Sequence, residues 1–105
     1  HILDLIVANE TDASETLTPP GTGGNITEPA KVREKFAGKV AVIGGMDQFN
    51  IVTDGTPEQI RAEVRRLFEG FGRDGGYILS MSDHFFETPP QKLKMYTDAA
   101  RECTY

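Results

Sequence analysis

Short continuous runs of hydrophobic residues alternate along this chain with segments whose hydrophobic residues are spaced as on a helix face. The runs at 40–43 and 77–81 are bounded by glycine or polar residues, and such runs are typical of strands covered on both faces. We therefore predict strands over 39–45 and 77–81. Residues 13–18, which lead into the Pro- and Gly-rich loop 19–24, are predicted to form a further short strand.

The clearest helix start lies at Thr56-Pro57-Glu58-Gln59. It combines a capping Thr, a Pro at the first helical position and a capping-box Gln three residues after the Thr. The hydrophobic residues that follow recur every three or four positions, as expected for one buried helix face; they are Ile60, Val64, Leu67, Phe68 and Phe71.

Three further helices are predicted. The dense hydrophobic residues of 2–9 indicate a helix docked on a sheet. The segment 28–36 follows Thr27, which is interpreted as its N-cap, and ends before Gly38. The last helix covers 89–103, and its expected contact residues are Leu93, Met95, Tyr96 and Ala100. The segment 46–55 between the second strand and its helix is predicted to be a loop.

The predicted order is helix, strand, helix, strand, helix, strand, helix. Strict alternation of this kind favours right-handed crossovers and a parallel sheet. The fold class is therefore α/β, with about three parallel strands alternating with four helices in a single domain over 1–105. Three strands leave two open sheet edges, so we expect either further strands or self-association to cover them.

Composition and charge narrow the classes of partner. The net charge is −5, and the basic cluster of Arg61, Arg65 and Arg66 alternates with glutamates at helical spacing, which indicates a solvated face and argues against nucleic-acid binding. No hydrophobic run approaches the ~20 residues that span a bilayer, so no membrane association is expected. The single cysteine, Cys103, favours a cytoplasmic protein.

The candidate chemistry lies in the loops that follow the predicted strands, where functional groups of parallel α/β folds collect. Asp47 follows the second strand, and the pair Asp83-His84 follows the third. Asp47 is interpreted as a general base, a ligand or a helix-orienting residue. His84 is a candidate general acid or base. Because adjacent residues rarely bond ring to carboxylate, Asp83 and His84 are not interpreted as a dyad.

The remaining site classes receive little support. The glycine-rich loop 19–24 lacks the lysine and spacing of a phosphate-binding motif, so it is predicted to be a plain connection. One cysteine and His84 are too few for a metal site, and no cofactor is expected. A small-molecule ligand remains a possible partner.

The order of these loops and of their glycine and proline residues resembles the C-terminal part of the uroporphyrinogen decarboxylase superfamily, which includes corrinoid-linked methyltransferases. The segments that carry the resemblance are 14–20, 23–26, 38–48, 55–60, 75–79 and 88–90. The resemblance implies a partial (β/α)₈ barrel whose three strands are the sixth, seventh and eighth. It also implies that a His after the last strand lines the substrate cleft, near Asp83 or His84.

The chain departs from the family pattern in that loop. The family's Gly-His-Gly is here Ser82-Asp83-His84-Phe85. The zinc-binding Cys of the thiol methyltransferases is missing from this loop, which disfavours a zinc-thiolate mechanism. The family's substrate-binding Arg and Asp residues come from the N-terminal part of the barrel.

The leading interpretation is a C-terminal fragment whose parent acts on a tetrapyrrole or a corrinoid-linked methyl group, and which is inactive alone. The alternative is a free-standing, self-associating α/β binding module without catalysis.

Overall fold

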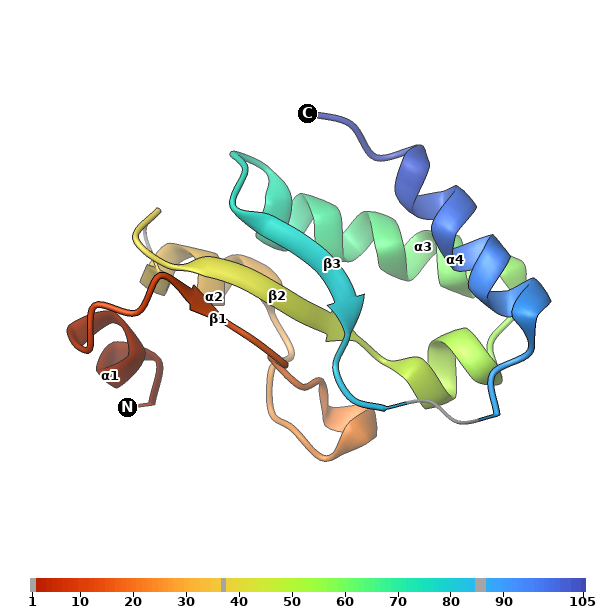
Figure 1. Cartoon of the computed structure of the whole chain (residues 1–105), viewed down its shortest axis with the longest axis horizontal. Helices are drawn as coiled ribbons and strands as arrows, with labels where there is room; N and C mark the ends of the chain where they lie inside the picture. Colours follow the sequence, from red (N-terminus) through yellow and green to blue (C-terminus); the bar gives the residue numbers. More distant parts are fainter. Residues whose placement is uncertain (1, 37, 85–86) are drawn as a thin grey trace.

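A three-stranded parallel sheet organises the chain in the computed structural model, which describes residues 2–36, 38–84 and 87–105 (Figure 1). The strands lie in the order β1-β2-β3 and all pair in parallel, as the alternation of elements predicts. The elements are α1 (Ile2–Ala8), β1 (Ala13–Ser14), η1 (Pro20–Thr22), α2 (Pro29–Phe36), β2 (Ala41–Met46), η2 (Gln48–Thr53), α3 (Pro57–Leu67), η3 (Phe68–Gly72), β3 (Tyr77–Met81) and α4 (Pro90–Arg101).

Helices cover one face of the sheet and leave the other open. The helices α2 and α3 lie on the same side of the strands (Figure 1), where Val42 and Met46 of β2 enter the buried core. Ile43 and Ile78 are paired in register on neighbouring strands, and neither packs against that core. With 58% of Ile78 exposed, the face opposite the helices is a hydrophobic surface that no described residue of the chain covers as a second layer.

The start of α3 has the predicted capping box. The Thr56 side chain accepts a hydrogen bond from the backbone N–H of Gln59, and the Gln59 side chain accepts one from the backbone N–H of Thr56. Four of the five predicted face residues are fully buried, namely Ile60, Val64, Leu67 and Phe71. Phe68 is half-buried.

The first strand is shorter than predicted. It covers Ala13–Ser14, whereas the sequence indicated 13–18. Thr16 and Leu17 adopt positive φ angles of 73° and 28°, and this backbone conformation turns the chain out of the sheet ladder. The proline- and glycine-rich segment that follows is a single 3₁₀ turn, η1, which ends at Gly23 with φ of 90°.

The segment 46–55, predicted to be a loop, contains the π-helical turn η2. The loop prediction was wrong because Asp47 caps this turn. Its side chain accepts hydrogen bonds from the backbone N–H groups of Phe49 and Asn50, which supplies acceptors for two donors that a helix start leaves unpaired.

Two helix predictions need correction, one at the start of the helix and one in its contact residues. The helix α2 begins at Pro29, so Glu28 rather than Thr27 precedes its first residue. In α4 the expected contacts Leu93, Tyr96 and Ala100 pack on the core, but Met95 is exposed and Ala99 is buried in its place. The side chain at 95 points away from the core because the buried face of α4 is formed by positions three or four residues apart, namely Leu93, Tyr96, Ala99 and Ala100.

The first helix packs on α2, where Asp4 accepts a 2.8 Å hydrogen bond from Lys35. Its Leu3, Ile6 and Val7 side chains pack against the buried core. A two-residue β1 offers little sheet surface, and Ile2 and Leu5 consequently stay exposed. Among the described residues, no helix has the length and hydrophobicity needed to span a bilayer.

Candidate functional site

The three loops that leave the carboxyl ends of the strands meet at one edge of the sheet. The Thr22 hydroxyl, after β1, lies 3.4 Å from the Ser82 hydroxyl, after β3. The Asn50 side chain, after β2, donates a 3.1 Å hydrogen bond to the carbonyl of Gly21. Parallel strands bring their carboxyl ends to the same edge, so residues 60 positions apart in sequence become neighbours here.

Asp47 is buried in this cluster, with 6% of the residue exposed. One carboxylate oxygen accepts hydrogen bonds from the backbone N–H groups of Phe49 and Asn50, at 3.1 and 2.8 Å, and the other accepts one from the Asn50 side chain at 2.9 Å. A side chain at Gly21 would place its Cβ 2.1 Å from the Asp47 carboxylate, so the close approach requires glycine. Of the three roles considered for Asp47, this geometry provides the helix-orienting one; the roles of base and ligand stay predictions.

Asp83 and His84 form a contact that the sequence interpretation excluded. One carboxylate oxygen of Asp83 accepts a 2.7 Å hydrogen bond from the His84 backbone N–H and also lies 2.9 Å from Nδ1 of the His84 ring. The prediction that they form no pair is therefore wrong, because a short side chain that turns back on the following N–H also reaches the ring. The two side chains are 61% and 82% exposed.

This contact also affects the ionisation of Asp83. The hydrogen bond from the His84 backbone N–H, followed by the contact with its ring, lowers the pKa of the Asp83 carboxyl below its ordinary value. Hydrogen bonds to the ionised form stabilise that form. A neutral His84 must carry its proton on Nδ1 to donate to Asp83, which leaves Nε2 as an acceptor at the exposed end of the ring.

A buried polar pair that the sequence interpretation did not select lies beneath these residues. Gln48 is 0% exposed and Ser82 2% exposed. The Ser82 hydroxyl lies 2.8 Å from the Met46 carbonyl and 3.0 Å from Oε1 of Gln48. Nothing in the local pattern separates a buried glutamine from an exposed one, since its burial depends on a strand 34 residues away. The only sequence signal is the position of both residues just after a strand.

Asp47 and the Asp83-His84 pair are thus placed on neighbouring loops but in different environments. The carboxylate of Asp47 is engaged within its own loop, whereas the pair projects outward from the end of β3. The exposed pair is accessible from solvent, while the hydrogen bonds of the buried groups link the loops. Within the described ranges, no group of three or more His, Cys, Asp or Glu side chains could hold a metal ion.

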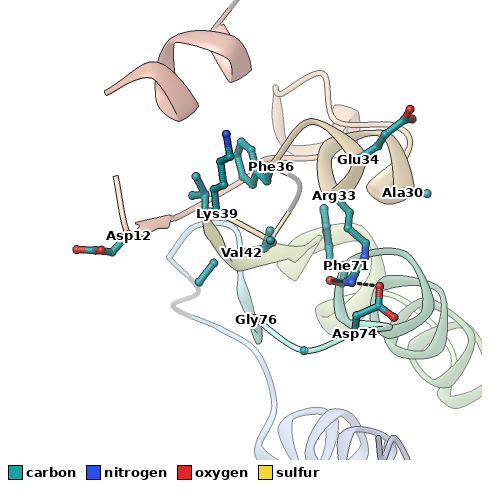
Figure 2. Close-up of a pocket in the computed structure, with 14 residues that line it drawn as sticks. Asp12, Ala30, Arg33, Glu34, Phe36, Lys39, Val42, Phe71, Asp74 and Gly76 are labelled. Atoms are coloured by element: carbon teal, nitrogen blue, oxygen red, sulfur yellow. Dashed lines mark hydrogen bonds and ion pairs between the residues drawn. The ribbon is translucent and has the colours of Figure 1, made fainter. Parts of the chain in front are cut away.

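A pocket of about 750 Å³ opens at the opposite end of the sheet, around the amino ends of β2 and β3 (Figure 2). Arg33 reaches into it from α2, donates a 2.6 Å hydrogen bond to the carbonyl of Phe71 and pairs with Asp74. Because this pocket lies away from the strand-end loops, it is not part of the candidate site. In barrel folds this end contributes to stability and the other end to chemistry.

Comparison with known proteins gives a consistent set of matches. Residues 22–103 match a family model described as uroporphyrinogen decarboxylase (URO-D). Two curated uroporphyrinogen decarboxylases, from Aliivibrio salmonicida (strain LFI1238) and from Actinobacillus pleuropneumoniae serotype 5b (strain L20), are each 32% identical to this chain. The matches extend over 75 and 74 residues and cover 70% of this chain in both cases. They cover 21% and 20% of the two relatives, so the chain spans about a fifth of their length.

Proposed function

The chain belongs to the uroporphyrinogen decarboxylase family, and from this premise we propose that it is the C-terminal part of a barrel that decarboxylates a tetrapyrrole. The names of the curated relatives support a tetrapyrrole decarboxylase over a corrinoid-linked methyltransferase. Corrinoid-linked methyl transfer remains the alternative activity of the parent protein. Three strands cannot close an eight-stranded barrel, so the chain alone is expected to be inactive.

The observation that carries the proposal is the exposed Asp83-His84 pair at the carboxyl end of β3. Decarboxylation breaks a carbon–carbon bond, releases carbon dioxide and leaves a carbon that must receive a proton. The protonated ring of a histidine at a strand end is suited to deliver that proton from Nε2, which leaves a neutral ring whose remaining proton on Nδ1 is donated to Asp83. Asp83 orients the ring through Nδ1, so that Nε2 is the atom directed to the substrate.

Asp47 has a supporting part in this proposal. By capping η2 and contacting Asn50, it holds the loop after β2 next to the loop after β1. We assign it no proton transfer, since all of its hydrogen bonds go to its own loop.

A chimera tests the proposal. Residues 22–103 of this chain replace the matching segment of the Aliivibrio salmonicida decarboxylase, and carbon dioxide release from uroporphyrinogen is measured. We expect activity in the chimera and a loss of about 100-fold or more on His84→Ala. The matched control is Lys94→Ala, which removes an exposed side chain of α4 and should leave the rate unchanged. Full activity of the His84→Ala chimera would remove the proposed role of His84.

A specific observation also supports the self-associating module as a second candidate. Ile43 and Ile78 form a hydrophobic pair on the open face of the sheet, and β1 and β3 are both edge strands. A second copy that covered this face would bury the pair. Under this candidate the isolated chain is a stable dimer, and its strand-end loops bind a small molecule without turnover.

A further inference from the structure

The turn η2 contacts the loop after β3 at two places, near the beginning and the end of that loop. At the beginning, Gln48, the first residue of η2, lies beside Ser82 at 3.0 Å. At the end, Thr53, the last residue of η2, lies beside Thr88, with 2.7 Å between the two hydroxyl oxygens. Asp83 and His84 lie between these two contacts.

The proton positions at the Thr53 contact follow from its neighbours. The Thr53 hydroxyl donates a 2.8 Å hydrogen bond to the carbonyl of Gln48. A hydroxyl has a single proton to donate, so Thr88 must donate to Thr53. The hydrogen bond therefore runs from Thr88 to Thr53, and Thr53 in turn donates to the backbone of η2. Together the two hydrogen bonds link the loop after β3 to that turn.

The Gln48 contact is constrained in the same way. Ser82 has two acceptors within 3.0 Å, the Met46 carbonyl and Oε1 of Gln48, but only one proton. Nε2 of Gln48 is buried without a hydrogen-bond partner among the described residues. A half-turn of the Gln48 amide lets Nε2 donate to the Ser82 hydroxyl, which then donates to the Met46 carbonyl, and it leaves Oε1 in the position without a hydrogen-bond partner among the described residues. Both residues are buried, where an unsatisfied polar group costs about 1–3 kcal/mol.

We propose that Gln48 and Thr53 are positioning residues that hold both ends of the segment carrying Asp83 and His84. The inference rests on the proposed function for its catalytic meaning, since it assumes that His84 faces the substrate. Its structural content stands without that function. The turn η2, capped by Asp47, then supports the loop that carries Asp83 and His84. The loop after β2 thereby affects the reaction through the position of the loop after β3.

The first test measures motion of the 105-residue chain without substrate. Backbone order parameters are compared for the parent chain, Gln48→Met and Thr53→Val, with Thr97→Val as the control, which deletes a hydroxyl bonded to the helix backbone of α4. In the parent the His84 amide should have an order parameter of about 0.85, falling toward about 0.6 in the two variants and not in the control. Thr53→Ser keeps the hydroxyl and should restore the parent value.

Two results would overturn the proposal. One is an unchanged order parameter at Asp83 and His84 in both variants. The other is an equal loss of order at Val42 and Ile43 in β2, because that outcome assigns Gln48 and Thr53 a general structural role.

The second test repeats Thr53→Val in the decarboxylase chimera and measures kcat and KM separately. A positioning role predicts that kcat falls about tenfold or more while KM changes little. An unchanged kcat beside a loosened loop would also overturn the proposal. A chimera without any activity would instead count against the proposed function, and the order parameters alone would then test the positioning of the loop.

Discussion

The Tyr77 hydroxyl donates a 2.9 Å hydrogen bond to the carbonyl of Gly44 on the neighbouring strand. Tyr77 begins β3, and its ring packs against Phe71 with 5.3 Å between ring centroids. Burial raises the pKa of this phenol, so the hydroxyl remains protonated and able to donate above the ordinary pKa of a tyrosine. Tyr96 of α4 provides a contrast, because its hydroxyl is buried without a partner among the described residues, and burial raises its pKa to about 12.

Removing these two hydroxyls should affect stability differently. Tyr77→Phe loses a hydrogen bond and is expected to lower the free energy of unfolding by about 1 kcal/mol. Tyr96→Phe removes a hydroxyl that was desolvated without compensation, and is expected to leave stability unchanged or raise it by up to about 1 kcal/mol. Urea unfolding of the two variants and the parent measures both changes. Equal destabilisation by both substitutions contradicts the assignment of partners.

Substitutions at Asp47 separate a capping role from a chemical one. Asp47→Ala removes every side-chain acceptor at the start of η2 and should cost about 0.5–2 kcal/mol of stability, whereas Asp47→Asn keeps a capping oxygen and should cost less. The measurement is denaturant unfolding, combined with carbon dioxide release in the chimera. Retention of most activity by Asp47→Asn is the expected result, and a stable but inactive Asn variant would restore the interpretation of Asp47 as a general base.

The pair Asp83-His84 should show a pH dependence at acid pH. Because the pKa of Asp83 is lowered in the folded chain, its contact with His84 is present above the ordinary carboxyl pKa and is lost as the pH falls through the lowered value. Between about pH 6 and about pH 2 the His84 amide resonance should shift together with the Asp83 carboxyl carbon. In Asp83→Asn this shift should disappear. A midpoint at or above that of an unperturbed aspartate is the contrary outcome.

The hydrophobic pair on the open face provides a test for self-association. Ile78→Ser removes half of that pair, and because Ile78 is largely exposed, its effect on chain stability should stay within about 1 kcal/mol. If copies associate through this face, light scattering will show a dimer of the parent chain and a monomer of the variant. Leu5→Ser, which changes another exposed hydrophobic residue, in α1, is the control and should leave the mass unchanged. A parent chain that is monomeric at all concentrations excludes this candidate.

The sequence alone was sufficient for the class of fold and for most of its elements. The capping box at Thr56 and the hydrophobic spacing from Ile60 to Phe71 depend on contacts within one helix and on its single buried face. The strand at 77–81 was likewise defined by its own run of residues. Alternation of the elements then gave the parallel sheet, and the ordered loops gave the family.

The sequence also identified the loops that carry the candidate site, but not how their side chains combine. It selected Asp83 and His84 and rejected their contact, because the return of the Asp83 side chain onto the following N–H depends on the backbone geometry after β3. It missed η2, since a single aspartate cap followed by one turn leaves no helical period in the pattern.

Tertiary structure alone established the pairing of Gln48 with Ser82 and of Thr53 with Thr88. These contacts join residues 34 and 35 positions apart, and they form because parallel strands deliver their loops to the same edge of the sheet. Local sequence fixes which residues enter each strand and helix, since those choices depend on near neighbours. The burial and partners of a polar side chain depend on which distant loop the sheet places beside it.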